Sequence, residues 1–290
     1  MNRIILILCV FLSAGVQSSG QPGILRSPNS VEEELKSVRG LVALWTFDEK
    51  KGDGYLSKGP FSCLLKEAGG RITSITEGPL SGKSLSLDGT AYLVIPNSET
   101  GKLNISGDKS EVTVIAWIKW SGEQTGFVAG MWNEYEDGGR RQYGLFASLP
   151  HYNGGNQVCG HISKTGHPTP PFPYSIDYSA SKQKIPVNEW CCIAFTYNGK
   201  YIKSFLNGKF EAREPELIDH TKGFEGHPDG LIQVKNPYYF PDGIGNNGSD
   251  FTVGAVRLKT GMGNFYKGLI GGIAVFDRAL TEKEIRAISG

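Results

Sequence analysis

Short apolar runs separated by glycine-, proline- and asparagine-containing turns repeat from about residue 40 to the end of the chain. Alternating and short continuous apolar runs bounded by such turns are typical of β-strands. The segment 111–120 is the clearest, and it carries apolar residues on both faces of a period-2 strand. Other parts of the fold are therefore expected to cover both of its faces.

The same pattern predicts strands throughout this region. Two Asn-Gly pairs, Asn198-Gly199 and Asn207-Gly208, separate successive strands and predict tight hairpin turns. The predicted strands cover residues 41–47, 84–88, 91–95, 111–120, 127–132, 141–148, 157–163, 190–197, 201–206, 209–213, 251–258 and 269–276.

Helical signals occur only at the two ends of this region. A capping box at Ser30–Glu33 predicts a short helix to about Arg39, and a second box at Thr281–Glu284 predicts a terminal helix. Between the strands, residues 164–188 and 214–250 are rich in proline and aromatic residues and are predicted to be long loops. Loops of this length inside a domain are often functional.

The first residues follow a different pattern. One basic residue, an apolar run from Ile4 to Leu12, and small residues up to Gly20 are typical of a secretory signal peptide. We therefore predict a signal peptide over residues 1–20, a lead-in over residues 21–39 and one domain over residues 40–290. The mature protein is expected to be secreted, periplasmic or at the cell surface.

Composition supports this interpretation and excludes some functions. The chain has 39 Gly and 15 Pro residues, which suits many short strands joined by turns. Its 30 Lys and Arg residues nearly balance 29 Asp and Glu residues, so a nucleic-acid partner is not expected. No later segment is apolar enough to predict a membrane span. The sequence leaves the oligomeric state open.

Four cysteines remain after the predicted signal peptide: Cys63, Cys159, Cys191 and Cys192. In an exported protein this even number predicts disulfides, and three pairings are open. A bond between the adjacent Cys191 and Cys192 would be strained, and the other two pairings both join Cys63 and Cys159 to this doublet. A metal cluster is disfavoured because no second close Cys or His spacing completes a tetrahedral site.

Six segments form a pattern when taken in order, namely residues 44–49, 84–89, 112–118, 189–199, 205–208 and 268–281. Together they resemble bacterial laminin G-like domains of the concanavalin A-like lectin and glucanase superfamily. The resemblance implies an all-β, two-sheet antiparallel jelly-roll sandwich with short helices at both ends, and ligands on its concave face or at its loop rim. This fold carries lectins, adhesion domains and glycoside-cleaving enzymes, so the resemblance does not fix function.

Some relatives of this kind bind calcium, and this chain departs from their pattern. Gly271-Gly272 occupies the position of an acidic pair in the last strand, and Asp48 alone is a weak metal ligand. Calcium prefers six to eight oxygen ligands. We therefore expect no cofactor, apart from calcium in a weak site at Asp48.

Catalytic patterns are largely missing. The acidic cluster at Glu134–Asp137 lacks the alternating spacing that places paired carboxylates on one strand face, as glycosidases need. His161 on a predicted strand, with many tyrosines nearby, is a partial match to polysaccharide lyases, but their supporting Arg and Gln motifs are absent. The sequence therefore favours a binding protein over an enzyme.

Sugar-binding sites combine aromatic side chains with amides and carboxylates, and the predicted loops contain these residues. We accordingly predict a glycan- or polysaccharide-binding module, although the same aromatic residues would also serve to pin long loops onto the sheet. A structural or protein-adhesion domain of the cell envelope and an unrecognised hydrolase or lyase are the alternatives. The candidate ligand-binding residues are Trp132, Asn133, Glu134, Tyr135, Tyr152, His161, Tyr174, Asp177, Tyr238 and Tyr239.

Overall fold

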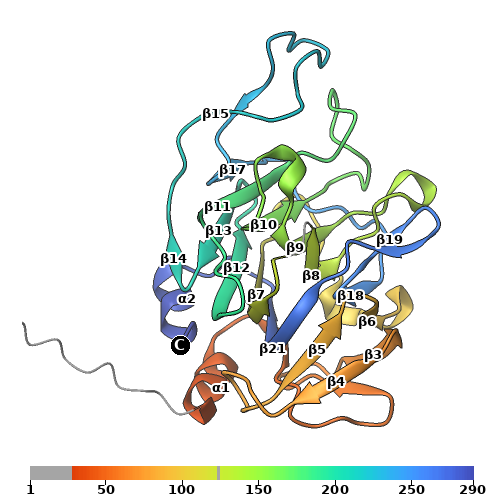
Figure 1. Cartoon of the computed structure of the whole chain (residues 1–290), viewed down its shortest axis with the longest axis vertical. Helices are drawn as coiled ribbons and strands as arrows, with labels where there is room; N and C mark the ends of the chain where they lie inside the picture. Colours follow the sequence, from red (N-terminus) through yellow and green to blue (C-terminus); the bar gives the residue numbers. More distant parts are fainter. Residues whose placement is uncertain (1–27, 123–124) are drawn as a thin grey trace, which may run out of the picture.

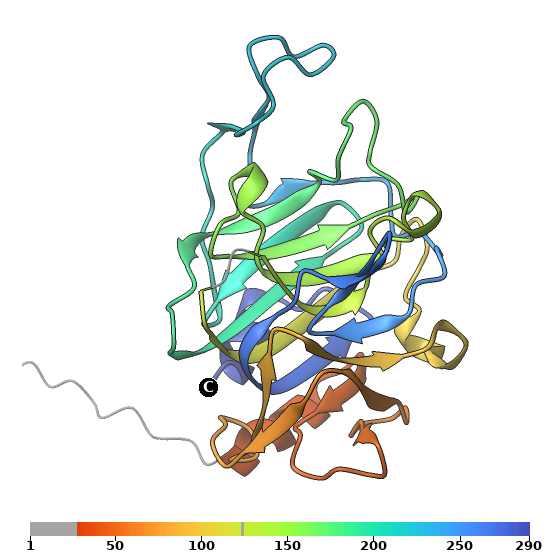
Figure 2. The same cartoon turned by 45° about the vertical axis from the view of Figure 1, so that its right-hand side comes forward.

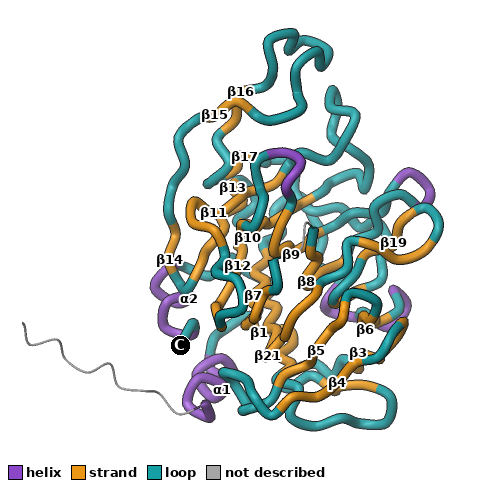
Figure 3. Tube along the Cα trace, viewed as in Figure 1, coloured by secondary structure: helices purple, strands orange, loops and turns teal. Residues whose placement is uncertain are grey.

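Two antiparallel β-sheets pack face to face in the computed structural model, which describes residues 28–122 and 125–290 (Figure 1). Strands make up most of both layers, and loops join them at the two ends (Figure 3). The predicted all-β antiparallel sandwich is therefore confirmed.

The first sheet contains nine strands. Strand β7 lies at its centre, hydrogen-bonded to β12 on one side and β21 on the other. In spatial order the strands are β14 (Lys209–Phe210), β13 (Tyr201–Leu206), β12 (Trp190–Tyr197), β7 (Val112–Trp120), β21 (Lys267–Phe276), β5 (Ser84–Asp88) and β4 (Ile72–Ile75), with β1 (Leu41–Trp45) on β21 and β17 (Tyr238–Tyr239) on β13.

The second sheet contains eight strands, and two small two-stranded pairs lie outside both sheets. The order of the eight is β11 (Tyr178–Lys184), β10 (Gln157–Ile162), β9 (Tyr143–Ser148), β8 (Gly126–Met131), β18 (Phe251–Val253), β6 (Ala91–Ile95), β3 (Leu64–Gly69) and β2 (Gly54–Leu56). The small pairs are β15 (Glu216–Leu217) with β16 (Ile232–Gln233), and β19 (Val256–Leu258) with β20 (Gly261–Gly263).

Helices are short and peripheral. The α-helices are α1 (Pro28–Ser37) and α2 (Glu282–Ile288), and the predicted Thr281–Glu284 capping box closes the start of α2. Helix α1 begins at Pro28, before the predicted box at Ser30–Glu33. The 3₁₀ turns are η1 (Asn97–Glu99), η2 (Gly101–Leu103), η3 (Glu136–Gly138) and η4 (Pro150–Tyr152).

Three apolar layers hold these elements together. The first lies between the two sheets and contains Val114 of β7 and Leu145 of β9. The second lies outside the nine-stranded sheet, where both α-helices cover the other face of β7, including Trp117. The third lies outside the eight-stranded sheet, where loops cover Phe146 and Tyr178. Strand β7 is thus buried on both faces, as its pattern predicts.

The two long insertions extend beyond the strands at the top of Figure 2. The prediction of a loop over residues 164–188 was partly wrong, because Tyr178–Lys184 forms β11 at the edge of the eight-stranded sheet. The predicted strand over residues 251–258 is divided between β18 and β19. The break falls at Gly254, whose backbone φ of 87° cannot continue a strand.

Two features of the sequence bear on the predicted secretion of the protein, a signal peptide and the presence or absence of membrane-spanning helices. The signal peptide predicted over residues 1–20 lies outside the described residues. Within residues 28–122 and 125–290, none of the helices has the length and apolar character needed to cross a membrane.

The predicted disulfides are not present, and all four cysteines of the described chain are free and buried. Adjacent residues of a strand point to opposite faces, so Cys191 lies between the sheets and Cys192 lies beneath the helices. Cys159 belongs to the layer outside the eight-stranded sheet. The cysteine doublet therefore cannot offer both thiols to one region of the fold.

Burial also makes these thiols unreactive. It raises the pKa values of Cys159, Cys191 and Cys192 to about 12. We expect a chain lacking residues 1–20 to show almost no rapid reaction with a thiol reagent when native. After unfolding without a reductant, four thiols should react, which a colorimetric thiol titration measures. A count of two would reveal a disulfide and contradict the structure.

Close approach of the two sheets gives a second prediction. A methyl group at Gly160 of β10 would clash with Phe195 of the facing sheet. Gly160→Ala should therefore lower the free energy of unfolding by about 1–3 kcal/mol, the usual cost of overpacking a core, as measured by urea denaturation. Gly155→Ala is the control, because its added methyl group would make only ordinary contacts, at 3.5 Å from Pro150. Equal stability of both variants would contradict the packing described.

Candidate functional site

A cavity of about 680 Å³ lies beside the third apolar layer, at the outer face of the eight-stranded sheet. Its walls come from the segment after β8, the turn η4 after β9, and the loop that precedes β11. This volume is within the range of about 300–1,000 Å³ that is usual for small-molecule sites. The cavity is therefore large enough for part of an oligosaccharide.

Four of the ten predicted ligand-binding residues line this cavity: Glu134, Tyr135, Tyr152 and Tyr174. They come from three separate segments, which only the fold brings together. The structure adds further lining residues that the sequence analysis did not select, namely Arg141, Pro150, His151, Pro173, Ser175, Tyr178 and Asn264.

Tyrosine rings form much of the cavity wall. Tyr135 and Tyr174 are 50% and 53% exposed, so both rings are available to a ligand. Tyr152 is buried, and its ring centre lies 6.4 Å from that of Tyr174. Aromatic faces of this kind can pack against the apolar C–H faces of a sugar ring, while the hydroxyl groups remain polar partners.

Arg141 supplies the positive charge of the cavity. It is only 3% exposed, and its Nη1 donates a hydrogen bond to the backbone oxygen of Gly166 at 2.9 Å. The ring of Tyr135 lies 5.5 Å from the guanidinium carbon. Burial lowers the pKa of Arg141, and the nearby carboxyl group of Glu134 opposes this shift. The sequence analysis missed Arg141 because it treated the residue only as the start of a strand.

Glu134 supplies the acidic group. Its backbone N–H donates to the oxygen of Arg257 at 2.9 Å, so the β19 segment fixes its position. Burial raises the pKa of Glu134, and the nearby charge of Arg141 only partly offsets this effect. The carboxyl group is therefore held closer to its neutral form than an exposed glutamate.

Trp132 and His161 do not reach this cavity. Both side chains are buried, and their ring centres lie 4.4 Å apart within the layer outside the eight-stranded sheet. Burial lowers the pKa of His161 well below its ordinary value, so the ring is neutral at neutral pH. Both rings pack within this layer, a contact that composition alone could not predict.

Asn133 faces a different hollow. Its Nδ2 donates to Oε2 of Glu136 at 2.8 Å, which closes the turn that follows β8. With Trp132 it borders a second cavity of about 290 Å³, which also includes Asp250 and Arg257. This places Asn133 beside the first cavity but not in it.

Asp177 and Tyr238 are buried and pin the two long insertions together. The hydroxyl group of Tyr238 donates to Asp177 Oδ1 at 3.1 Å. Nearby, Lys235 is fully buried, donates to the oxygen of Ile176 at 3.0 Å and lies 3.8 Å from the ring centre of Tyr178. Burial lowers the pKa of Lys235 to about 7. These contacts agree with the alternative that the aromatic residues of the long loops hold those loops against the sheet.

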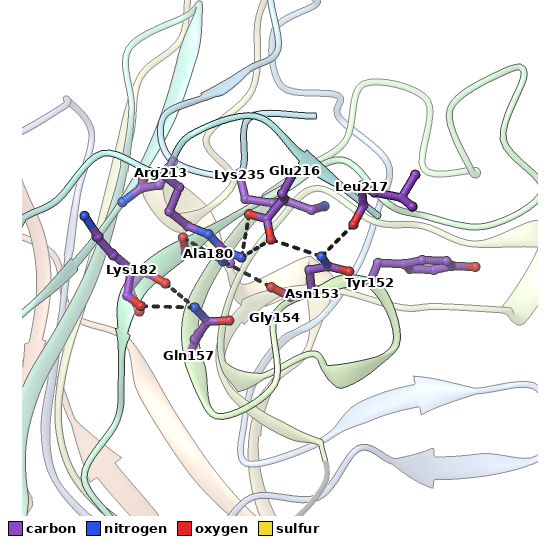
Figure 4. A network of polar contacts seen from close by, with 12 residues as sticks. Tyr152, Asn153, Gly154, Gln157, Ala180, Lys182, Arg213, Glu216, Leu217 and Lys235 are labelled. Carbon is purple, nitrogen blue, oxygen red and sulfur yellow. Dashed lines mark hydrogen bonds and ion pairs between the residues drawn. The ribbon is translucent and has the colours of Figure 1, made fainter. Parts of the chain in front are cut away.

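A polar network continues this attachment (Figure 4). Arg213 pairs with Glu216 at 2.5 Å, and Asn153 Nδ2 donates to Glu216 Oε2 at 3.0 Å. Asn153 also donates to the oxygen of Leu217, and it directly follows Tyr152 of the cavity wall. The second insertion is thereby fastened to the turn that carries Tyr152.

Tyr239, the last predicted aromatic residue, lies outside the cavity. It is 55% exposed on β17, where its ring centre is 5.5 Å from that of Tyr201. This strand extends the nine-stranded sheet, whereas the cavity lies at the eight-stranded sheet.

The weak calcium site predicted at Asp48 does not fit the ion. Oδ2 of Asp48 accepts a hydrogen bond from Lys58 Nζ at 2.7 Å, and Oδ1 accepts one from Thr46 at 2.9 Å. No cluster of three His, Cys, Asp or Glu side chains suited to a metal occurs in the described parts of the chain. Acidic side chains at Gly271 and Gly272 would clash with Pro79 and Leu80.

The chemistry available in the cavity is limited. Glu134 is the one carboxyl group among its described lining residues. Glycosidases generally place two carboxyl groups about 5–9.5 Å apart around the scissile bond. A pair of carboxyl groups with this spacing is therefore not found among the described lining residues.

Comparisons with known proteins agree on fold. No family model matches the sequence, and no curated protein matches it. Among solved structures, the chain is similar to domain 4 of AbnA, a GH43 extracellular arabinanase from Geobacillus stearothermophilus, in complex with arabinotriose. The TM-score is 0.52 with 17% identity, over 86% of this chain and 98% of that domain.

Two toxin domains are also similar. The binding domain of Paraclostridial Mosquitocidal Protein 1 has a TM-score of 0.51 and 13% identity, over 88% of this chain and 52% of that one. The binding domain of Botulinum Neurotoxin DC, in complex with SialylT, has a TM-score of 0.51 and 9% identity, over 86% and 51%. This chain thus spans about half of each toxin domain, and the likeness shows a shared fold.

The partial burial of Glu134 makes the stability of the fold depend on pH. Its pKa is raised in the folded state, so the fold favours the neutral form, and stability falls as pH rises through that pKa. Glu134→Gln should therefore raise the melting temperature at pH 8, and this gain should shrink towards pH 4, as measured by differential scanning calorimetry. The exposed Glu225→Gln variant is the control. A gain that is independent of pH would contradict this account.

Proposed function

We propose that the protein is a secreted, non-catalytic binding module that recognises a glycan or polysaccharide in the cavity between Tyr135 and Tyr174. The observation that carries the proposal is the composition of the cavity. Four tyrosine rings line it together with one glutamate, one arginine and one histidine side chain. Ligand sites of this type combine a largely apolar lining with a few polar groups that fix orientation.

Similar folds support this proposal. The arabinanase domain was solved with arabinotriose, and one neurotoxin domain was solved in complex with SialylT. A sugar-binding use of the fold is therefore documented in proteins of comparable architecture. The apolar run within residues 1–20 supports secretion, and the lone carboxyl group of the described cavity lining supports a non-catalytic role.

A protein-adhesion role is the second candidate, and one surface favours it. Leu217 and Ile232 pair across β15 and β16 and are 48% and 67% exposed. This small pair projects beyond the two sheets at the top of Figure 1. Exposed apolar side chains at the tip of an insertion would suit contact with another protein.

The tyrosines provide the test of glycan binding. A glycan array should identify a ligand, and calorimetry should then show that Tyr135→Ala and Tyr174→Ala each weaken its binding about tenfold, or about 1.4 kcal/mol. Both rings are half exposed, so the melting temperature should change little. Tyr239→Ala is the matched control, because this equally exposed ring lies outside the cavity.

Two results would oppose the proposal. If the protein binds no glycan on the array, the glycan-binding proposal is contradicted and the adhesion role is favoured. New reducing ends, or the absorbance of unsaturated uronates, after incubation with polysaccharides would instead show an enzyme.

A further inference from the structure

Arg141 has hydrogen-bonding capacity that the described protein does not use. Its Nη1 is bonded to Gly166, but its buried Nε has no hydrogen-bond partner among the described residues. The hydroxyl group of Ser175, which also borders the cavity, is buried without a partner there as well. Buried donors are nearly always satisfied in native proteins, so such groups beside a cavity point to a ligand or ordered water.

The charge of the cavity is also incompletely balanced. Arg141 is the one Lys or Arg among the described lining residues, and Glu134 is the one acid. Burial raises the pKa of Glu134, which weakens its negative charge. No direct ion pair between Glu134 and Arg141 is present within the described chain. The cavity therefore holds a buried guanidinium group that lacks a bonded counter-ion.

The arrangement around Arg141 favours a planar anion. The guanidinium group is planar and can bind a carboxylate through two parallel N–H groups. The Tyr135 ring lies against it and reduces its contact with water. Because charges interact more strongly where water is excluded, an anionic group placed here would be held tightly. A neutral sugar would leave the buried positive charge unpaired.

We propose that the cavity binds a carboxylate-bearing sugar unit, such as a uronate, and that Arg141 is the residue that selects it. Tyr135 and Tyr174 would hold the sugar ring, while Arg141 and the Ser175 hydroxyl group would bind the carboxylate oxygens. This inference rests on the proposed glycan-binding function, since it names the chemical class of the glycan.

The test compares three kinds of probe by calorimetry. The first is a panel of oligouronides prepared from pectate, alginate and hyaluronan. The second contains the same oligosaccharides after chemical reduction of their carboxyl groups, and the third contains oligosaccharides that carry sulfate esters but no carboxyl groups. For the native protein we expect at least one oligouronide to bind tenfold or more tightly than its reduced form and than the sulfated probes.

Variants of Arg141 then test whether this residue causes the preference for an oligouronide over its reduced form. Arg141→Gln should bring the oligouronide down to the affinity of its reduced form, and the affinity for the reduced form should change less than twofold. Arg141→Lys should keep part of the preference. Arg140→Gln is the matched control, because the neighbouring Arg140 pairs with Asp137 and does not line the cavity; it should keep the full preference.

Each contrary outcome has a distinct meaning. Equal binding of oligouronides and their reduced forms, or preference for sulfate esters, would overturn the carboxylate proposal but leave glycan binding intact. No binding to these probes or to any array glycan would overturn both. If Arg141→Gln fails to fold, the affinity of the native protein is measured over a series of NaCl concentrations instead. Oligouronide affinity must fall as NaCl rises while that of the reduced form stays constant, and equal responses would overturn the proposal.

Discussion

The outer face of the eight-stranded sheet is apolar, and the rest of the structure depends on how this face is covered. Phe127, Phe146 and Tyr178 point away from the space between the sheets and would be exposed without further cover. No α-helix of the described chain covers them, because both α-helices pack on the other sheet. Long loops must therefore bury this face, and the candidate site forms where they meet.

Burying the face with loops has an energetic cost. Loops carry polar backbone groups that need partners away from water, and the structure provides them with side chains such as Asn153 and Asn236. Lys235 is the extreme case, since a fully buried amine is costly unless it is well bonded. Its contacts with Ile176 and Tyr178 join the two insertions. The cavity walls are thus parts of one connected assembly.

This dependence on loops explains what the sequence could and could not reveal. Most strands of the sandwich were predictable because periodicity and Asn-Gly turns are local signals, but β2, β3 and β4 were not predicted. Strand β11 was missed because it follows a proline-rich stretch and begins with residues that resemble the preceding loop. Trp132 and His161 lie outside the larger cavity, and the sequence could not show this because an aromatic residue that packs a loop has the same local pattern as one that lines a cavity.

The cavity itself was partly predictable. Glu134, Tyr135, Tyr152 and Tyr174 were selected as aromatic and acidic loop residues, and the structure brings them to one cavity, yet nothing in their spacing showed that they converge. Arg141 was missed because its role in the cavity depends on its burial next to Tyr135, which lies six residues earlier in the chain. Such information exists only once the segment after β8 and the first long insertion are folded together.

The four free cysteines affect when the chain can fold. A sandwich closed by disulfides must wait for an oxidising compartment, whereas here apolar packing and non-covalent polar contacts hold the described residues together without a disulfide. Nothing in this arrangement ties the native state to oxidation. If the chain is exported, as its first 20 residues indicate, it could fold too early on the cytoplasmic side. Its export would then depend on translocation outpacing folding, or on a chaperone that keeps the chain unfolded until it has crossed.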